Sequence, residues 1–235
     1  PAAQQRAFLC CISYKNRKRW ELKGSFKDLK NMTDLLLQQF GFSPDSLLIL
    51  ADKEPYPPPT RKNIEEGFKW LVKDIQSGAS LVFYYSGHGR RQQSFRGDER
   101  DGFDEAICPL DFQANGVIFD NYINANIVRP LTTGVTLHAF IDCCYSGTIL
   151  DLSHVYNANT RKWEDNRALT DEFKGTSGGR AICISACQDN QLAADTSRLS
   201  GDENDTNGAM TWSFIKAIKD NRKITYSGIL NSMQE

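Results

Sequence analysis

Residues 140–147 read FIDCCYSG, and this stretch decides how the chain folds. An apolar run over 135–141 enters it, and a Ser-Gly pair that interrupts regular structure leaves it. The pattern predicts a buried strand that ends by delivering Asp142 and two thiols, Cys143 and Cys144, to a turn. Cys143 directly follows the strand, so we expect it to pack beneath the turn, with Cys144 as the reactive thiol.

A second stretch has the same design, because residues 80–89 read SLVFYYSGHG. A strand again ends in a turn, which here carries His88 between two glycines. Parallel strands gather their carboxyl ends at the edge of a sheet where ligands bind. The two stretches therefore predict Cys144 as a nucleophile and His88 as its base, with the N–H groups of Gly89 and Cys144 as oxyanion donors. The alternative is a packing role for Cys144 and a turn role for His88, but both residues lie beyond the apolar runs.

Apolar runs and helical periodicities alternate along the chain. This alternation predicts an α/β fold with a mostly parallel central sheet and helices on both faces. Strands are expected over 7–13, 46–51, 80–85, 135–141 and 180–186. Helices are expected over 24–40, 60–75, 121–128 and 210–218, with a further element after 224. A hairpin is expected from 106–110 and 116–119, and irregular polar segments over 90–105 and 155–179.

Composition excludes several classes of function. The 235 residues have a formal net charge of −1, so no general nucleic-acid or membrane-binding surface is expected. No apolar run approaches the roughly 20 residues of a membrane span. The seven cysteines are odd in number and lack CxxC spacing, which argues against a disulfide framework and a zinc site. We expect a reducing compartment, the cytoplasm, and a monomer.

Two acidic residues near the predicted strand ends need an explanation. Asp142 lies beside the nucleophile, where a carboxylate opposes thiolate formation unless a cation offsets it. An Arg or Lys side chain of a substrate would be that cation. Asp28 falls in the first turns of a predicted helix near another strand end. Helix capping and surface solvation account for these two carboxylates equally well from the sequence alone.

An acidic group follows the histidine. Its members are Asp98, Glu99, Asp101, Asp104, Glu105 and Asp120. A solvated face is the usual meaning of such a run, and the group lacks the pattern of an EF-hand loop. A calcium site assembled from separate loops is the alternative.

The motifs around His88 and Cys144 resemble those of the metacaspases, in the caspase-like clan of cysteine peptidases. Both the 85–89 and the 142–147 stretches match the family pattern. Further matches lie at 97–99, 102–105, 148–152, 188–191 and 194–196. The resemblance covers essentially the whole chain and looks closest to the plant type I branch.

The resemblance implies a caspase-like fold and cleavage of proteins or peptides after Arg or Lys, in programmed cell death or stress responses. It assigns His88 as base and Cys144 as nucleophile. It also implies that Asp28, Ser86 and Asp142 line the pocket for the basic side chain. A calcium ion that activates the enzyme is implied at Asp104, Asp120, Asn121 and Asp151.

The resemblance further implies one peptidase domain over 1–235. Its large-subunit region spans about 1–155, its linker 156–179, and its small-subunit region 180–235, which is expected to be incomplete at its C-terminal end. The linker reads as exposed and basic, with Arg161, Lys162, Arg167 and Lys174 as candidate self-cleavage positions. A catalytically silent scaffold of the same family is the alternative function, and a flavodoxin-like nucleotide binder is disfavoured because no glycine loop follows the first strand.

Overall fold

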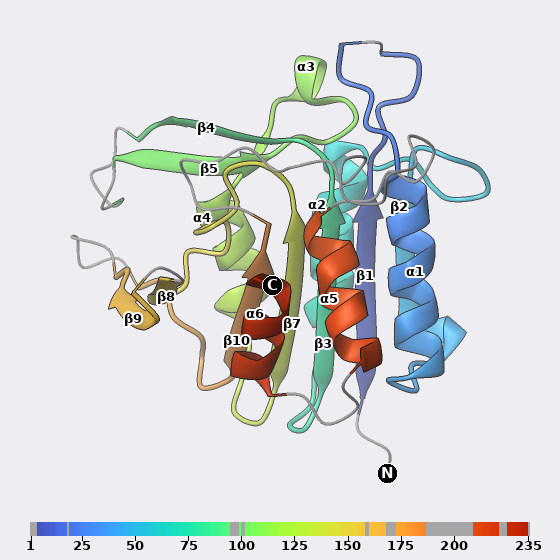
Figure 1. The fold of residues 1–235 in the computed structure, drawn as a ribbon. Coiled ribbons are helices and arrows are strands. Elements are labelled where there is room, and N and C mark those ends of the chain that lie inside the picture. The colour runs from blue at the N-terminus through green and yellow to red at the C-terminus, as the bar shows by residue number, and fades with distance from the viewer. Residues whose placement is uncertain are drawn as a thin grey trace.

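The computed structural model describes residues 4–17, 19–94, 99, 102–157, 160–167, 173–186, 209–220 and 225–234. At its centre is a five-stranded sheet in the order β10-β7-β3-β1-β2 (Figure 1), and every neighbouring pair in it is parallel. These strands are β1 (Gln5–Cys11), β2 (Leu47–Ala51), β3 (Ser80–Ser86), β7 (Thr136–Asp142) and β10 (Arg180–Ser185). The predicted α/β class and all five predicted strands are confirmed.

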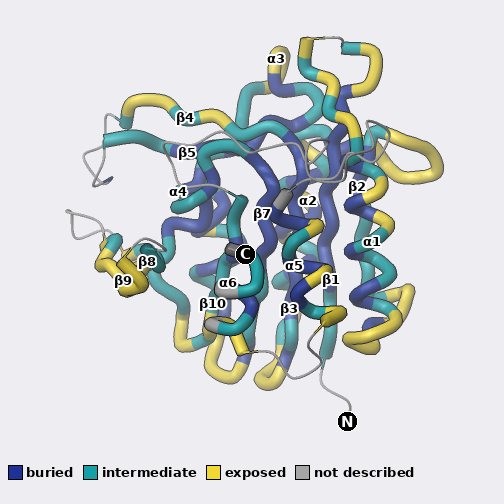
Figure 2. Tube along the Cα trace, in the orientation of Figure 1, coloured by how far each residue is buried: buried dark blue, intermediate teal, exposed yellow. Residues whose placement is uncertain are grey.

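Helices cover both faces of the sheet. One face packs against α1 (Ser25–Gln38), α5 (Ala209–Asp220) and α6 (Tyr226–Gln234). The other face packs against α2 (Arg61–Val72), α4 (Asp120–Ile123) and a π-helical turn over Asn124–Val128. The central strands are buried along most of their length (Figure 2), as expected for a sheet covered on both faces.

Local chemistry explains where the two long helices begin. Gly24 precedes α1 with φ 93°, a left-handed conformation that glycine adopts without steric cost. The hydroxyl of Thr60 accepts a hydrogen bond from the N–H of Asn63 and so caps α2.

Two small antiparallel sheets extend the fold beyond the predicted elements. The expected hairpin is present as β5 (Phe103–Ile107) and β6 (Ile118–Phe119), and β4 (Gly89–Gln93) pairs with β5. A second hairpin is formed by β8 (His154–Asn157) and β9 (Lys162–Asp165). The prediction of irregular structure over 90–105 and 155–179 was therefore wrong in part. The sequence of β4, GRRQQ, has no apolar alternation, because both of its faces are largely solvated.

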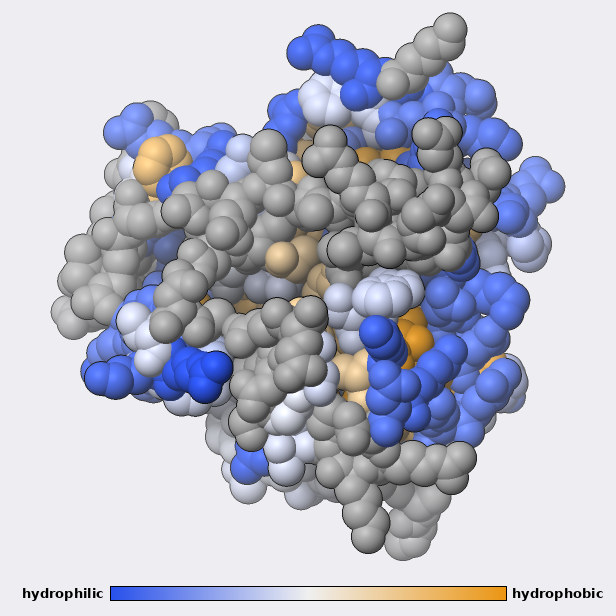
Figure 3. Space-filling view, in the orientation of Figure 1, coloured by the Kyte–Doolittle hydropathy of each residue, from blue (hydrophilic) through white to orange (hydrophobic). Residues whose placement is uncertain are grey.

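The remaining elements are a 3-10 turn at Pro44–Ser46 and the short helix α3 (Phe112–Asn115). Among the described helices, none is both long enough and apolar enough to cross a membrane. A groove of about 940 Å³ lies between α1 and the α5–α6 pair, and apolar side chains show there in Figure 3. Ser80, Val82 and His138 line this groove, which places it toward the amino ends of β3 and β7 and away from the turns that carry His88 and Cys144.

Candidate active site

His88 lies in a two-residue turn between the buried strand β3 and the exposed strand β4. Two fully buried tyrosines hold its backbone. The hydroxyl of Tyr14 accepts the N–H of His88 at 3.0 Å, and the hydroxyl of Tyr85 donates to the His88 carbonyl at 2.9 Å. Burial raises the pKa of both tyrosines well above 10, so they remain protonated donors. The turn is therefore fixed before any substrate binds.

Trp20 fixes the ring of His88. Its carbonyl oxygen lies 2.7 Å from the Nε2 atom of His88. A carbonyl oxygen can only accept a hydrogen bond, so Nε2 carries the proton, and in the neutral ring Nδ1 is left as the acceptor. The imidazole also packs against the rings of Trp20 and Tyr14, at centroid distances of 5.6 and 4.7 Å. The loop that contains Trp20 thus selects the tautomer of His88.

Burial lowers the pKa of His88 below its ordinary value of 6.5. The hydrogen bond to the Trp20 carbonyl works in the opposite direction, and the positive charge of Arg90 lowers the pKa further. The guanidinium of Arg90 stacks over the rings of Trp20 and Phe112, at 5.2 and 4.8 Å, which holds it near the histidine. A base with a lowered pKa is neutral, and able to accept a proton, down to a lower pH.

We expect the acid limb of kcat/KM against pH to lie below 6.5 and to move upward in Arg90→Gln, because that variant removes a cation that disfavours the imidazolium. The measurement is hydrolysis of an Arg-containing fluorogenic peptide across a pH series. Arg19→Gln is the matched control, since Arg19 also stacks on Trp20 but does not shift the pKa of His88. An Arg90→Gln profile that coincides with the native one would contradict this assignment.

The turn after β7 brings Cys144 against the histidine turn. A Cβ added to Gly89 would lie 2.0 Å from the carbonyl oxygen of Cys144 and 2.9 Å from the Sγ atom of Cys143. Cys143 is 1% exposed, in agreement with its expected packing role, and Cys144 is half-buried. The two turns predicted from separate stretches of sequence are therefore in contact, and the absence of a side chain at Gly89 permits it.

The N–H of Gly89 is directed away from the strand that pairs with β4. Gly89 lies opposite Ile107 in the β4–β5 pair, and the N–H of Cys108 donates to the His88 carbonyl at 3.0 Å. This pattern makes Gly89 and Ile107 a non-hydrogen-bonded pair, so the N–H of Gly89 points away from β5.

The opposite face of the same sheet edge carries Asp142, one of the residues predicted to bind the basic side chain of a substrate. The Oδ2 atom of Asp142 accepts two hydrogen bonds from Thr211, from the N–H at 3.0 Å and from the hydroxyl at 2.7 Å. Thr211 is the third residue of α5, where backbone N–H groups have no partner within the helix. Its hydroxyl gives its proton to Asp142, so it accepts from Tyr84, whose oxygen lies 3.1 Å away.

The structure brings the other two predicted pocket residues to the same place. Asp28 is 1% exposed and lies in the first turn of α1, on the face of the sheet that α5 covers. Burial raises the pKa of Tyr84 well above 10, and the charges of Asp28 and Asp142 raise it further, so both carboxylates lie near its hydroxyl. Ser86 is in register with Asp142 on the neighbouring strand. The three residues predicted to line an acidic pocket therefore lie close together, at the edge of the sheet from which Cys144 extends.

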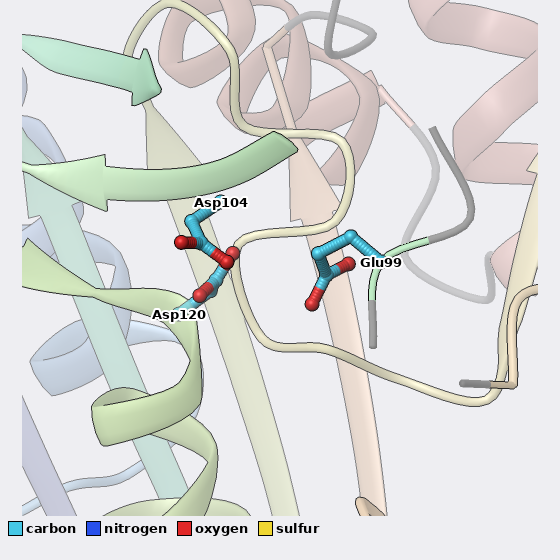
Figure 4. A group of neighbouring side chains, drawn as sticks. All are labelled: Glu99, Asp104 and Asp120. Atoms are coloured by element: carbon cyan, nitrogen blue, oxygen red, sulfur yellow. The ribbon is translucent and has the colours of Figure 1, made fainter. Parts of the chain in front are cut away.

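An acidic cluster lies farther out, beneath β5. Carboxylate oxygens of Glu99, Asp104 and Asp120 lie within 4.8 Å of one another (Figure 4). The carboxylate of Asp120 accepts the N–H groups of Glu105 at 2.7 Å and Asn121 at 2.6 Å. Burial raises the pKa of Asp120 to about 8, and the charge of Asp151 adds to this effect. Such a cluster is stable as anions only when a cation is near.

Lys174 supplies a cation from the segment before β10. Its Nζ atom lies 2.5 Å from Oε1 of Glu99 and 3.1 Å from Oδ2 of Asp151. The side chain is 9% exposed. Burial disfavours its charged form, yet the pKa of Lys174 is raised because Glu99 and Asp151 favour that form more strongly.

A sequence model described as metacaspase, peptidase C14 domain, matches residues 5–153. The chain belongs to the metacaspase family. Metacaspase-1 of Arabidopsis thaliana is 50% identical over 240 residues, which cover 100% of this chain and 65% of the relative. Metacaspase-3 of the same plant is 45% identical over 99% of this chain and 65% of its own length. The chain thus spans about two thirds of these curated relatives.

The fold comparison agrees with the family. A solved structure of a Geobacter sulfurreducens protein superposes with a TM-score of 0.66 and covers 98% of this chain and 88% of its own. At 21% identity, this similarity shows a shared α/β fold alone. Of the motifs that resemble metacaspases, those at 188–191 and 194–196 and residues 97–98 lie outside the described residues.

The acidic cluster of this metacaspase fits a calcium ion. Its donors are all carboxylate oxygens, which calcium prefers, and oxygens on opposite sides of one calcium ion lie about 5 Å apart. The buried Oδ1 atom of Asp104 has no hydrogen-bond partner among the described residues, so it is available to a ligand. Asp104 and Asp120 of the expected set lie together, Asn121 follows Asp120, and Asp151 joins the cluster through Lys174.

Sequence reasoning missed the residues that support this site. No local pattern in the sequence marks these residues. Trp20 contacts His88 through its backbone carbonyl, and Tyr14 and Thr211 contact residues that are far away in the sequence. Glu99 was one acidic residue in a run. The prediction that Lys174 is exposed was wrong, because its side chain is buried and its ammonium group pairs with two carboxylates. Arg161, Lys162 and Arg167 are exposed, as predicted.

Proposed function

We propose that this metacaspase is a cysteine endopeptidase that cleaves after Arg or Lys and requires calcium. The observation that carries the proposal is the contact between the His88 and Cys144 turns, together with the buried carboxylates of Asp28 and Asp142 at the same edge of the sheet. Nothing in the described residues favours the alternative of a silent scaffold.

The arrangement supports acyl transfer. Nδ1 of His88 takes the thiol proton of Cys144, and the thiolate sulfur attacks the carbonyl carbon of the scissile bond. The N–H of Gly89 donates to the oxygen that becomes negative, and the N–H of Cys144 is the second expected donor. The imidazolium then returns its proton to the departing amine as the C–N bond breaks. Water, deprotonated by the same imidazole, hydrolyses the thioester and restores the thiol.

The acidic pocket supports the choice of substrate. The buried carboxylates of Asp28 and Asp142 favour a cation, and a guanidinium or ammonium group of a substrate supplies it. This cation also offsets the effect of Asp142 on the thiolate. An Asp side chain, by contrast, would meet like charges.

Calcium would bind Asp104 and Asp120 beneath β5, the strand that pairs with β4 and hence with the residue after His88. When bound, it would supply positive charge that orders these loops. We propose that self-cleavage occurs after the exposed residues Arg161, Lys162 or Arg167. We further propose that the enzyme acts in programmed cell death or stress responses.

The test is hydrolysis of three fluorogenic peptides with Arg, Lys or Asp before the scissile bond, with and without calcium. We expect turnover of the Arg and Lys peptides only, with calcium only, and its loss in Cys144→Ala. Circular dichroism of that variant serves as the folding control. Absence of turnover by the native chain at every calcium concentration would favour the scaffold.

A further inference from the structure

Lys174 and a metal ion would compete for the same carboxylates. Glu99 belongs to the three-carboxylate cluster and also forms an ion pair with the Lys174 ammonium. Asp151, which the family resemblance places among the calcium ligands, forms an ion pair with the same ammonium. A divalent cation bound to these carboxylates would repel an ammonium group that pairs with the same carboxylates. The two cations therefore exclude one another.

The backbone of Lys174 is anchored independently of its side chain. The Nδ2 atom of the buried Asn124 donates to the carbonyl of Lys174 at 2.8 Å and to that of Leu150 at 2.9 Å. Three residues later, the N–H of Ser177 donates to the Arg129 carbonyl at 3.2 Å. The long side chain can therefore leave the cluster while its backbone stays in place.

We propose that Lys174 is an internal cation that occupies the acidic cluster in the absence of calcium, and that calcium binds by displacing its ammonium group. The lysine acts as a tethered plug, which neutralises part of the buried charge and sets the calcium concentration at which the site fills. This inference rests on the proposed calcium dependence, and it adds a residue that makes the apparent affinity lower than the carboxylates alone would give.

Isothermal titration with calcium chloride tests the plug directly. All chains carry Cys144→Ala, so that self-cleavage does not interfere. Lys174→Met removes the ammonium and keeps most of the aliphatic stem, and we expect it to bind calcium about tenfold more tightly or better. Lys162→Met is the matched control, because it removes the same charge from the exposed strand β9, where solvent screens it. We expect its affinity to equal that of the parent.

The outcomes separate the two proposals. Equal or weaker calcium binding by Lys174→Met, beside normal binding by the parent, would overturn the plug and leave calcium dependence intact. Absence of binding heat in all three chains would overturn the calcium dependence itself.

A second measurement keeps Lys174 in place and does not depend on the fold of a variant. The Cys144→Ala chain is acetylated briefly with N-hydroxysuccinimidyl acetate, and each lysine is quantified by peptide mass spectrometry. We expect slow modification of Lys174 without calcium and a severalfold faster rate with it, while exposed Lys162 reacts equally in both. A rate at Lys174 that calcium leaves unchanged would contradict displacement.

Discussion

Gly89→Ala is expected to lower kcat/KM for an Arg-containing peptide by about 100-fold or more, because a displacement of catalytic groups by about 1 Å has that cost. The added Cβ would lie 2.0 Å from the carbonyl oxygen of Cys144, a backbone atom that no rotamer change can remove. The histidine turn and the cysteine turn would have to separate. The oxyanion donor moves with them, so we expect the loss mainly in kcat.

Gly41→Ala is the control for the conformational cost of losing a glycine. Gly41 has φ 69° and nothing within 4 Å of its added Cβ, so the change strains the backbone by about 1–2 kcal/mol without a clash. We expect a lower melting temperature and unchanged kcat/KM. Near-native activity of a folded Gly89→Ala would show that the turns tolerate separation and would contradict the geometry proposed for catalysis.

Motifs inside or directly after apolar runs were predictable from the sequence. The strands that deliver His88 and Cys144 are buried on both faces, so their composition alone marks them, and parallel pairing then places both turns at one edge. The same reasoning placed Asp142. It could not place Thr211, because α5 reaches Asp142 across 69 residues and the contact depends on how the helix packs.

Exposed and irregular parts were less predictable for a related reason. The β4 strand has a polar sequence because solvent covers much of it, so pairing with β5 leaves no hydrophobic pattern to detect. Lys174 shows the converse case. A lysine in a polar segment is usually solvated, but this one is buried and pairs with carboxylates from two other segments, at Glu99 and Asp151. A family resemblance supplied Asp151, but no feature of the sequence linked Lys174 to it.

Asp142→Asn is expected to lower kcat/KM for Arg and Lys peptides by about 100-fold, because an ion pair with a buried carboxylate contributes about 2–5 kcal/mol when one partner is removed. Asparagine has the same shape, and its amide oxygen can accept the two hydrogen bonds from Thr211. The substitution therefore removes the negative charge and keeps the two hydrogen bonds that hold the first turn of α5 against β7. We expect similar circular dichroism and a similar melting temperature.

The substrate series separates a specificity role from a structural one. Asp45→Asn is the charge-matched control, because Asp45 lies exposed in the 3-10 turn before β2. We expect this variant to leave kcat/KM unchanged for peptides with Arg, Lys or Gln before the scissile bond. If Asp142 recognises the basic side chain, Asp142→Asn loses most of the preference for Arg and Lys over an uncharged residue of similar length, such as Gln. Because the thiolate no longer has a carboxylate beside it, hydrolysis of the Gln peptide should stay the same or rise. Equal losses for the Arg and Gln peptides would contradict this specificity role. Asp142 would then act only by supporting α5 through its two hydrogen bonds with Thr211.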